Sequence, residues 1–335
     1  MTAMMSVTPT ISVIIATRDR AESLREVLTD LAAQATEGQF TYEVLVADNE
    51  STDGTKALVE RLAATFPVPL VYLFEGRRGK AFALNMAIAK AQGEWIALTD
   101  DDVRIGPTWL STIHQTAHAF HADGVGGPTK PLWVGDRPHW LSDRLVRQLG
   151  IVDYGPNPFR VMDARTLFIG PNAAYRKILF TRHGGFDEER NHASQDVEWF
   201  LRVLRAGYTM IYQPQAALYH KVDARRWTPR TLAHRFFQHG RGSSLGLQEQ
   251  GTARTLCRVP LWVVRYWLTL HWEAAACWLR GEQDEALWHW LRRYFYLGAM
   301  WYCFEDWAQR RPMRRARPAI VAEPVSPKLT SSARS

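Results

Sequence analysis

The chain has 335 residues, 46% of them hydrophobic and 22% charged, which excludes a disordered or fibrous protein and fits one large globular domain or two modest ones. Its formal net charge of +7 suits phosphorylated ligands, an anionic membrane surface or nucleic acid. The three cysteines, at 257, 277 and 303, are too widely spaced for a disulfide framework or a zinc site. No charged leader precedes an apolar run at the amino terminus, so we expect the protein to act in the cytosol.

The first hundred residues alternate between β-branched runs and segments of helical spacing. The runs at 11–16, 42–47 and 70–74 predict buried strands, and a fourth strand leads into the acidic triplet 100–102. Strands that alternate with helices of this length predict a parallel, doubly wound α/β sheet. Right-handed crossovers place the carboxyl ends of such strands on one edge, where ligands bind.

Residues 124–170 are rich in Gly, Pro, Trp and Arg and show little periodicity, which is typical of loops and short strands that cover a site. Trp133, His139 and Trp140 would either stack on a sugar ring or seal a hydrophobic core.

Regular structure is predicted again from residue 168 onward. The segment 168–175 predicts a strand, and the helical pattern from Gln195 to Leu204 predicts a helix. Two short strands are expected on either side of Pro214, the second ending at His220.

The acidic triplet Asp100, Asp101 and Asp102 ends an apolar run. An unpaired charge in a dry site costs several kcal/mol, so three carboxylates there call for a cation. Hard oxygen ligands suit Mg²⁺ or Mn²⁺, which would in turn hold a diphosphate. A solvated acidic turn is the alternative, but Asp48 ends the second strand on the same edge and favours the metal site.

Six segments in this order and spacing resemble family 2 of the inverting nucleotide-sugar glycosyltransferases, in particular its bacterial non-processive members. The segments are 12–20, 46–55, 79–85, 93–102, 184–187 and 195–196. The resemblance implies the GT-A fold over residues 10–245, a mainly parallel doubly wound sheet. A nucleotide-binding half would occupy 10–105 and an acceptor half 106–245.

The same resemblance implies a donor site. Asp48 matches the carboxylate that binds the nucleotide base, and Thr17 and Arg18 lie beside it at the end of the first strand. Arg78 and Lys80 border the nucleotide, where a cation offsets diphosphate charge.

Asp100 and Asp102 match the outer positions of the family's DXD motif, with the first acid facing the ribose and the last holding the metal. Asp101 is also acidic here, which leaves open which oxygens reach the ion, and we place it on the donor side. His220 is a second expected ligand of Mn²⁺ or Mg²⁺, the alternative being a structural histidine.

On the acceptor side, Asp196 matches the family's catalytic base, which removes the proton of the attacking hydroxyl. The chain has Gln195 where the family has Glu, and we place Gln195 with Trp133 and Trp140 near the acceptor. The implied reaction moves a sugar from a nucleotide-diphosphate sugar, UDP-linked by family habit, to a glycan or lipid-linked acceptor. Nucleic acid is then not an expected partner.

The segment 246–309 has a different character, with eight tryptophans between Trp262 and Trp307. Helices are predicted at about 257–280 and 284–308, but charged residues interrupt both, so neither predicts a membrane span. Trp, Tyr and Arg mixed on a helix favour the headgroup interface, and packing on the catalytic domain or a second subunit is the alternative. We therefore expect a peripheral protein on the inner face of the cell membrane.

The two ends of the chain are expected to lack fixed structure. Residues 1–9 predict a flexible start, and 310–335 a disordered tail whose first part is strongly basic and would attract anionic lipid.

Two other interpretations stay open. A processive polysaccharide synthase needs membrane spans and a QxxRW motif, of which 223–227 shares only the last two residues. A degenerate GT-A domain acting as a membrane-bound assembly partner is the non-enzyme alternative, which the acids at 48, 102 and 196 argue against.

Overall fold

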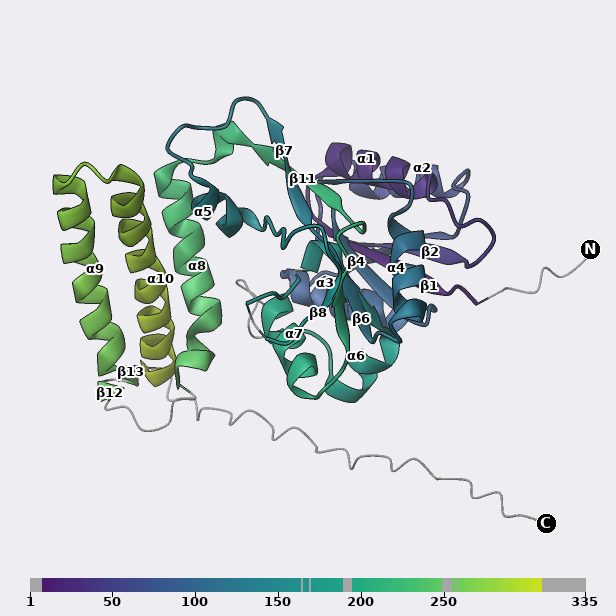
Figure 1. The fold of residues 1–335 in the computed structure, drawn as a ribbon. Helices are drawn as coiled ribbons and strands as arrows, with labels where there is room; N and C mark the ends of the chain where they lie inside the picture. The colour runs from purple at the N-terminus through teal and green to yellow at the C-terminus, as the bar shows by residue number, and fades with distance from the viewer. Residues whose placement is uncertain are drawn as a thin grey trace, which may run out of the picture.

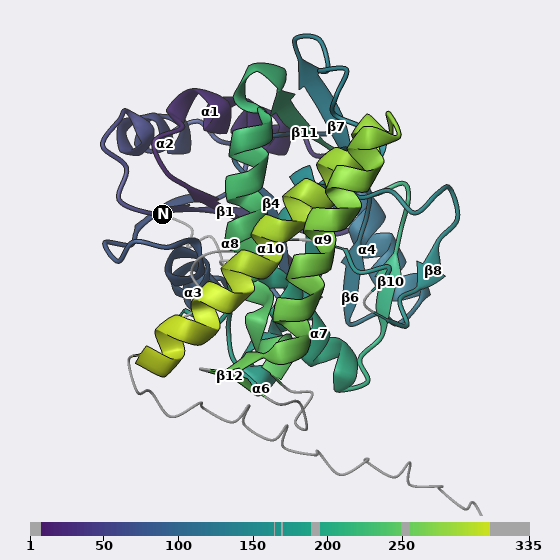
Figure 2. The ribbon, with the colours of Figure 1, turned by 90° about the vertical axis from the view of Figure 1, so that its left-hand side faces the viewer.

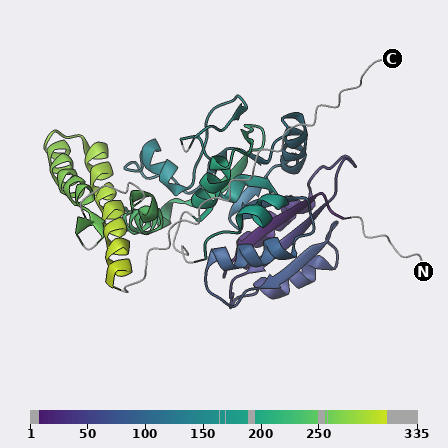
Figure 3. The ribbon, with the colours of Figure 1, turned by 90° about the horizontal axis from the view of Figure 1, so that it is seen from below.

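The computed structural model describes residues 8–163, 165–168, 170–188, 195–248, 255–256 and 258–308. An α/β domain is followed by a layer of long helices on one side of it (Figures 1 and 3). Nearly all of the predicted flexible start 1–9 and the whole of the predicted tail 310–335 lie outside the described residues.

The described part of the chain forms a central sheet of eight strands in the order β3-β2-β1-β4-β9-β6-β10-β8. β9 is antiparallel to β4 and β6, β8 is antiparallel to β10, and the other neighbours are parallel. The predicted mainly parallel sheet is therefore confirmed. The strands are β1 (Ile11–Thr17), β2 (Tyr42–Asp48), β3 (Leu70–Phe74), β4 (Trp95–Asp100), β6 (Gly124–Gly126), β8 (Phe159–Arg160), β9 (Ala173–Arg176) and β10 (Met210–Tyr212).

Helices cover both faces of this sheet, as the doubly wound prediction requires. In β1, Val13 and Ile15 pack into the cluster on one face and Ile14 into the cluster on the other. A strand buried on both sides needs a continuous apolar run, and each such side chain contributes about 1.5–3 kcal/mol. One face carries α1 (Ala21–Ala32), α2 (Thr55–Ala63) and α4 (Trp109–Ala119), and the other α3 (Lys80–Lys90), α6 (Lys177–His183) and α7 (Gln195–Arg205).

A second sheet, in the order β5-β11-β7, lies beside the end of β4. Its strands are β5 (Val103–Ile105), β11 (Leu218–Asp223) and β7 (Thr129–Val134). His220 of β11 is paired with Val103, the residue that follows the acidic triplet. This pairing is what brings a histidine from the second half of the domain to the triplet.

The strand predicted at 168–175 is wrong in its first half. Residues Gly170–Asn172 form a 3₁₀ turn, η2, and the strand begins only at Ala173. Pro171 has no N–H to donate to a ladder. The Asn172 side chain instead donates to the carbonyls of Pro128 and Ala216, at 2.9 and 2.8 Å, which fixes the turn.

The short elements α5 (Asp143–Val146), η1 (Arg147–Leu149) and η3 (Ala224–Arg226) connect the α/β domain to the helical layer. The layer itself consists of α8 (Pro229–Gln248), α9 (Leu261–Leu279) and α10 (Gln283–Ala308), with the hairpin β12 (Thr255–Leu256) and β13 (Val259–Pro260). α9 and α10 correspond to the two predicted aromatic helices.

α8 lies nearest the α/β domain, α10 packs on α8, and α9 is outermost (Figure 1). A shared cluster that includes Leu145, Phe236 and Leu291 joins α5, α8 and α10. The domain limit expected at residue 245 falls inside α8. No helix in the described ranges is both long and apolar enough to cross a membrane.

Candidate active site

The carboxyl ends of β1, β2 and β4 meet at one edge of the central sheet. Thr17 is in register with Asp48, and Ala16 with Asp100. The expectation that Asp48 and the acidic triplet share an edge is therefore confirmed. This edge is the crevice in which open α/β sheets bind ligands.

Asp48 is buried, with 1% of its surface exposed, and both carboxylate oxygens have partners. One accepts the backbone N–H of Ser51 at 2.8 Å, and the other accepts the hydroxyl of Tyr72 at 2.7 Å. Burial raises the pKa of Tyr72 well above its ordinary value, and the bond to Asp48 raises it further, so the phenol keeps its proton and donates. Asp48 is thus held rigidly at the crevice.

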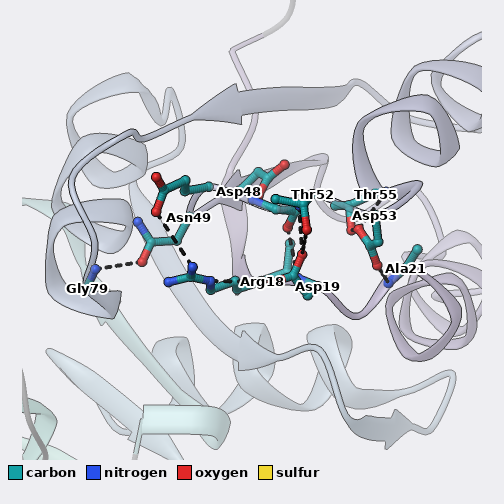
Figure 4. A network of polar contacts seen from close by, with 12 residues as sticks. Arg18, Asp19, Ala21, Asp48, Asn49, Thr52, Asp53, Thr55 and Gly79 are labelled. Atoms are coloured by element: carbon teal, nitrogen blue, oxygen red, sulfur yellow. Dashed lines mark hydrogen bonds and ion pairs between the residues drawn. The ribbon is translucent and has the colours of Figure 1, made fainter.

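Asn49, the next residue, fixes the loop between β3 and α3 (Figure 4). Its Oδ1 accepts the N–H of Gly79 at 2.7 Å, and its Nδ2 donates to the carbonyl of Arg77 at 2.7 Å. Gly79 has φ of 144°, a conformation that favours glycine and aims α3 at the crevice. Arg78 belongs to this loop, and Lys80 begins α3.

Arg18 lies on the other side of the same network. Its guanidinium is 3.6 Å from Glu50 and 3.5 Å from Asp19, which in turn accepts the N–H and hydroxyl of Thr52. Figure 4 shows these contacts tying the turn after β1 to the turn after β2. Thr17 instead points to the triplet.

Two cations neutralise the three acids of the triplet, and Asp101 and Asp102 share Arg20. Asp100 is paired with Lys80 at 2.5 Å, and Asp102 with Arg20 at 2.5 Å. Asp101 is the most buried, 6% exposed, and accepts Thr17 Oγ1 at 2.7 Å and Arg20 Nη1 at 3.0 Å. Burial raises the pKa of Asp101, and the Arg20 charge only partly offsets it. Asp101 is therefore a structural anchor, and Asp100 and Asp102 face the crevice on either side of it.

Asp102 and His220, the two residues predicted to hold a metal, lie next to each other, and their role as ligands stays a prediction. His220 Nε2 lies 3.2 Å from Asp102 Oδ1, close to the separation of about 3 Å between adjacent ligands of an octahedral Mg²⁺-type ion with 2.1 Å bonds. Burial raises the pKa of Asp102, but the hydrogen bonds and charges of His220 and Arg20 lower it by more than burial raises it. The pKa of Asp102 is therefore below its ordinary value, and the carboxylate is ionised. His220 Nδ1 is buried and has no hydrogen-bond partner. The donor set fits a hard or borderline divalent ion.

Within the described residues no group of three or more His, Cys, Asp or Glu side chains gathers for a metal. An ion at Asp102 and His220 would therefore need further oxygens from its ligand, as Mg²⁺ and Mn²⁺ commonly take from phosphates.

Asp196, the expected base, lies in the first turn of α7. One carboxylate oxygen accepts the N–H of Gly170 at 2.9 Å, and the other the N–H of Val197 at 2.9 Å. A Cβ on Gly170 would lie 3.0 Å from that carboxylate, so the glycine allows the close approach. Lys80 links the two sides: burial lowers its pKa, but the charges of Asp100, Asp196 and Asp101 raise it overall. The predicted base therefore lies within electrostatic reach of the predicted donor site.

Four residues of the site are absent from the sequence prediction: Arg20, Tyr72, Arg235 and His239. Arg20 lies in the matched segment 12–20, two residues after Arg18. Both arginines were therefore candidates for the site, and only Arg18 was chosen. Tyr72 alternates on β3 with side chains of the opposite face, which is a weaker signal.

Arg235 and His239 are one helical turn apart on α8. Arg235 Nε donates to the carbonyl of Gln148 at 2.7 Å, and the described part of the chain gives it no ion-pair partner. Burial lowers the pKa of Arg235, while the charges of Asp196, Asp100 and Asp102 raise it. Burial and Arg235 lower the pKa of His239 to about 4, so the imidazole is neutral at pH 7. α8 therefore adds a cation and a neutral imidazole to the crevice.

Trp133 and Trp140 pack, partly buried, against the cluster that joins the α/β domain to α8 and α10, as the alternative of a core role expects. Their contact with an acceptor stays a prediction. Arg137 lies over the Trp133 ring at 5.7 Å. Gln195 begins α7 beside Asp196, and its place on the acceptor side stays a prediction.

Comparison with known proteins shows which family the chain resembles. The model described as "Glycosyl transferase family 2" matches residues 12–184. The chain is 27% identical over 229 residues to the succinoglycan biosynthesis protein ExoM of Rhizobium meliloti, covering 66% of this chain and 70% of that protein. It is 23% identical over 243 residues to a glucosyl-dolichyl phosphate glucuronosyltransferase of Haloferax volcanii, covering 69% and 75%.

Among solved structures, the mannosyltransferase PcManGT of Pyrobaculum calidifontis, in complex with GDP-Man and Mn²⁺, aligns with a TM-score of 0.52 and 20% identity. The alignment covers 91% of this chain and 74% of that one. At this identity the likeness concerns the fold, and it extends the agreement beyond the α/β domain.

Proposed function

The chain belongs to glycosyl transferase family 2, and we propose that it is an inverting enzyme that moves a sugar from a nucleotide-diphosphate sugar to the hydroxyl of a glycan or lipid-linked acceptor. That it is a glycosyltransferase with the GT-A fold follows from the family. The observation that supports the finer proposal is the pair of acidic sites whose charges both raise the pKa of Lys80, namely the triplet on the sheet edge and Asp196 on α7.

On the donor side, Asp48 would accept a hydrogen bond from the base, and the loop held by Asn49 would border the nucleotide. Asp102 and His220 would hold Mn²⁺ or Mg²⁺, which supplies Lewis-acid stabilisation of the leaving diphosphate when bound. Lys80 and Arg20 would contribute positive charge toward the diphosphate, since both cations are already ordered at the site by their carboxylate partners.

On the acceptor side, Asp196 accepts the proton of the attacking hydroxyl as the new glycosidic bond forms. Two backbone N–H groups hold its carboxylate in place, so it needs no reorganisation during the reaction. A single displacement by the acceptor inverts the anomeric carbon and needs no carboxylate nucleophile. UDP-sugars are the first donors to test, since neighbours of the fold include a complex with UDP as well as one with GDP-Man.

The proposed setting is the inner face of the cell membrane. α9 and α10 expose large aromatic and aliphatic side chains, Trp272 to 79% and Trp278 to 69%. Tryptophans of this kind favour the headgroup region of a bilayer.

The direct test is turnover of a panel of UDP-, GDP- and dTDP-sugars with Mn²⁺ or Mg²⁺, followed as release of the nucleoside diphosphate. We expect the sugars of one nucleotide class to be hydrolysed slowly in the absence of an acceptor. The same nucleotide sugars should raise the Tm of the protein. Absence of binding and of turnover across the panel would instead support the degenerate assembly partner.

A further inference from the structure

α8 and α10 touch backbone to backbone at a pair of glycines. A Cβ on Gly240 would lie 1.8 Å from the carbonyl oxygen of Phe295, and a Cβ on Gly298 would lie 2.0 Å from that of Phe237. Helices that carry larger residues at the contact stay about 8–10 Å apart. Figure 2 shows α10 crossing α8 obliquely, so the helices separate on either side of this point.

A groove of about 570 Å³ opens between the two helices on one side of the crossing. Phe237 of α8 and Trp290, Tyr294 and Leu297 of α10 form its walls, and Arg230 and His234 of α8 add two basic groups. Pockets for organic ligands have this size and this mixture of an apolar lining with few polar groups.

The groove continues onto an exposed apolar stripe. Leu297, Trp301 and Phe304 follow one another at helical spacing on α10 and are 38%, 49% and 46% exposed. An occupant of the groove therefore has room to extend along α10 as an apolar chain. A compact sugar or nucleotide would leave this stripe uncovered.

The basic end of the groove calls for an anion. Arg230 forms no ion pair or hydrogen bond within the described ranges, and the hydrogen bond that His234 makes there is with Gln238, at 3.5 Å. Arg293 also lies over the Trp290 ring at 5.7 Å. The groove thus joins an aromatic wall to unneutralised positive charge, which is complementary to a lipid chain that ends in a phosphate.

The position of the groove connects it to the crevice. On α8, residues 230, 234 and 237 share one face, whereas Arg235 and His239 lie on the opposite face, within electrostatic reach of Asp196. The two sites are thus separated by one helix, about 10 Å across.

We propose that this groove binds the phosphate end of the isoprenoid chain of a lipid-linked acceptor, with the phosphate at Arg230 and His234 and the chain against the aromatic wall. The proposal rests on the proposed function, because it assigns a site to one of the two acceptor classes considered there. It also separates recognition of a single carrier lipid in the groove from adsorption to the bilayer through α9.

The test is a tryptophan-fluorescence titration of the full chain with farnesyl phosphate below its aggregation concentration, with farnesol, inorganic phosphate and dihexanoyl phosphatidylglycerol as competitors. We expect saturable binding, with each of the three competitors at least tenfold weaker. Equal affinity for farnesol would show that the phosphate is not recognised. Equal affinity for the phosphatidylglycerol would show a general lipid surface, and either result would overturn the proposal.

Two variants locate the site. Arg230→Gln and Leu297→Glu are each expected to weaken farnesyl phosphate binding at least tenfold. Leu268→Glu is the matched control, because Leu268 is 52% exposed on α9 and does not line the groove. Circular dichroism and the Tm check that the variants fold, and unchanged binding by folded Leu297→Glu would overturn the assignment.

Nucleotide-sugar turnover is measured in parallel, so that the two hypotheses fail separately. Wild-type protein without donor turnover contradicts the proposed function, whereas turnover without farnesyl phosphate binding contradicts only the groove.

Discussion

Arg20 donates through one guanidinium nitrogen to both Asp101 and Asp102, and Lys80 neutralises Asp100. These pairs explain how three adjacent carboxylates are tolerated at the end of a buried strand. Removing Arg20 would leave the largely buried carboxylate of Asp101 without its cation, although the Arg20 side chain itself is 38% exposed and its charge is partly screened by solvent. Arg20 therefore supports the site before any ligand arrives.

Asp196→Asn is expected to lower kcat by about 10²–10⁴-fold, since the amide cannot accept the acceptor's proton. Donor binding, measured by calorimetry with the nucleoside diphosphate, should change less than twofold. Asp123→Asn is the control, because Asp123, just before β6, also accepts a backbone N–H, from Thr209 at 3.0 Å. Loss of donor affinity in step with turnover would contradict the role of Asp196.

Asp102→Asn and His220→Ala are expected to raise the Mn²⁺ concentration for half-maximal effect at least tenfold. Electron paramagnetic resonance of free Mn²⁺ measures this without turnover, in the presence of the nucleoside diphosphate. His114→Ala, on α4, should bind as the wild type does. Unchanged Mn²⁺ affinity in both site variants would contradict the metal pair.

His239 makes the fold acid-sensitive. Its pKa is about 4 in the folded chain and about 6.5 when unfolded, so the unfolded state takes up the proton first as the pH falls. The free energy of unfolding is expected to decrease by up to about 3 kcal/mol from pH 6.5 to pH 4. In urea denaturation at a series of pH values, His239→Gln should flatten this dependence. An equally steep dependence in the variant would assign it to other groups.

At the scale of elements, the strands of the first half were predictable because β-branched runs buried on both faces have few alternatives. The runs 11–16, 42–47 and 70–74 match β1, β2 and β3 to within one residue. The same regular pattern predicts the edge of the sheet at which Asp48 and the triplet lie. Local sequence was therefore sufficient to locate the site residues that directly follow a predictable strand.

α8 was not predicted, and the site residues Arg235 and His239 were missed with it. Its segment contains Gly240, Gly242 and Gly246, each of which costs a helix about 1 kcal/mol relative to alanine. Packing against α10 at Gly240 outweighs this cost, and such packing is a tertiary effect that local propensity does not contain. Arg20 was missed for a similar reason, since only the fold distinguishes it from Arg18.

Gly298→Val is expected to destabilise the helical layer, because the added side chain meets the carbonyl of Phe237 and the backbones cannot stay in contact. Overpacking of this kind costs about 1–3 kcal/mol, measured as a shift in the urea midpoint. Gly106→Ala is the control, since a Cβ there has no neighbour within 4 Å. An unchanged midpoint for Gly298→Val would contradict the close crossing.

At the scale of the whole molecule, we expect adsorption to anionic bilayers through α9. Co-sedimentation with phosphatidylglycerol vesicles should exceed that with phosphatidylcholine vesicles and weaken in 0.5 M salt, about the concentration at which surface charges are largely screened. Trp272→Ser with Leu279→Ser should reduce binding at least fivefold. Phe74→Ser is the control, since Phe74 is 59% exposed on β3, the edge strand at the far end of the central sheet from β8. Equal loss in the control would contradict a directed surface.

The two faces of α8 have a consequence for how this chain can be divided. A cut at residue 245 would keep α8 but remove α10, and Phe236 and Leu232 would lose the partners that bury them. Arg235 and His239 would then have no fixed position beside Asp196. The three helices therefore cannot be replaced independently of the α/β domain, either in evolution or by design. A recombination seam that preserves the enzyme has to fall before Pro229, and whatever replaces the helices has to supply a new wall for the crevice.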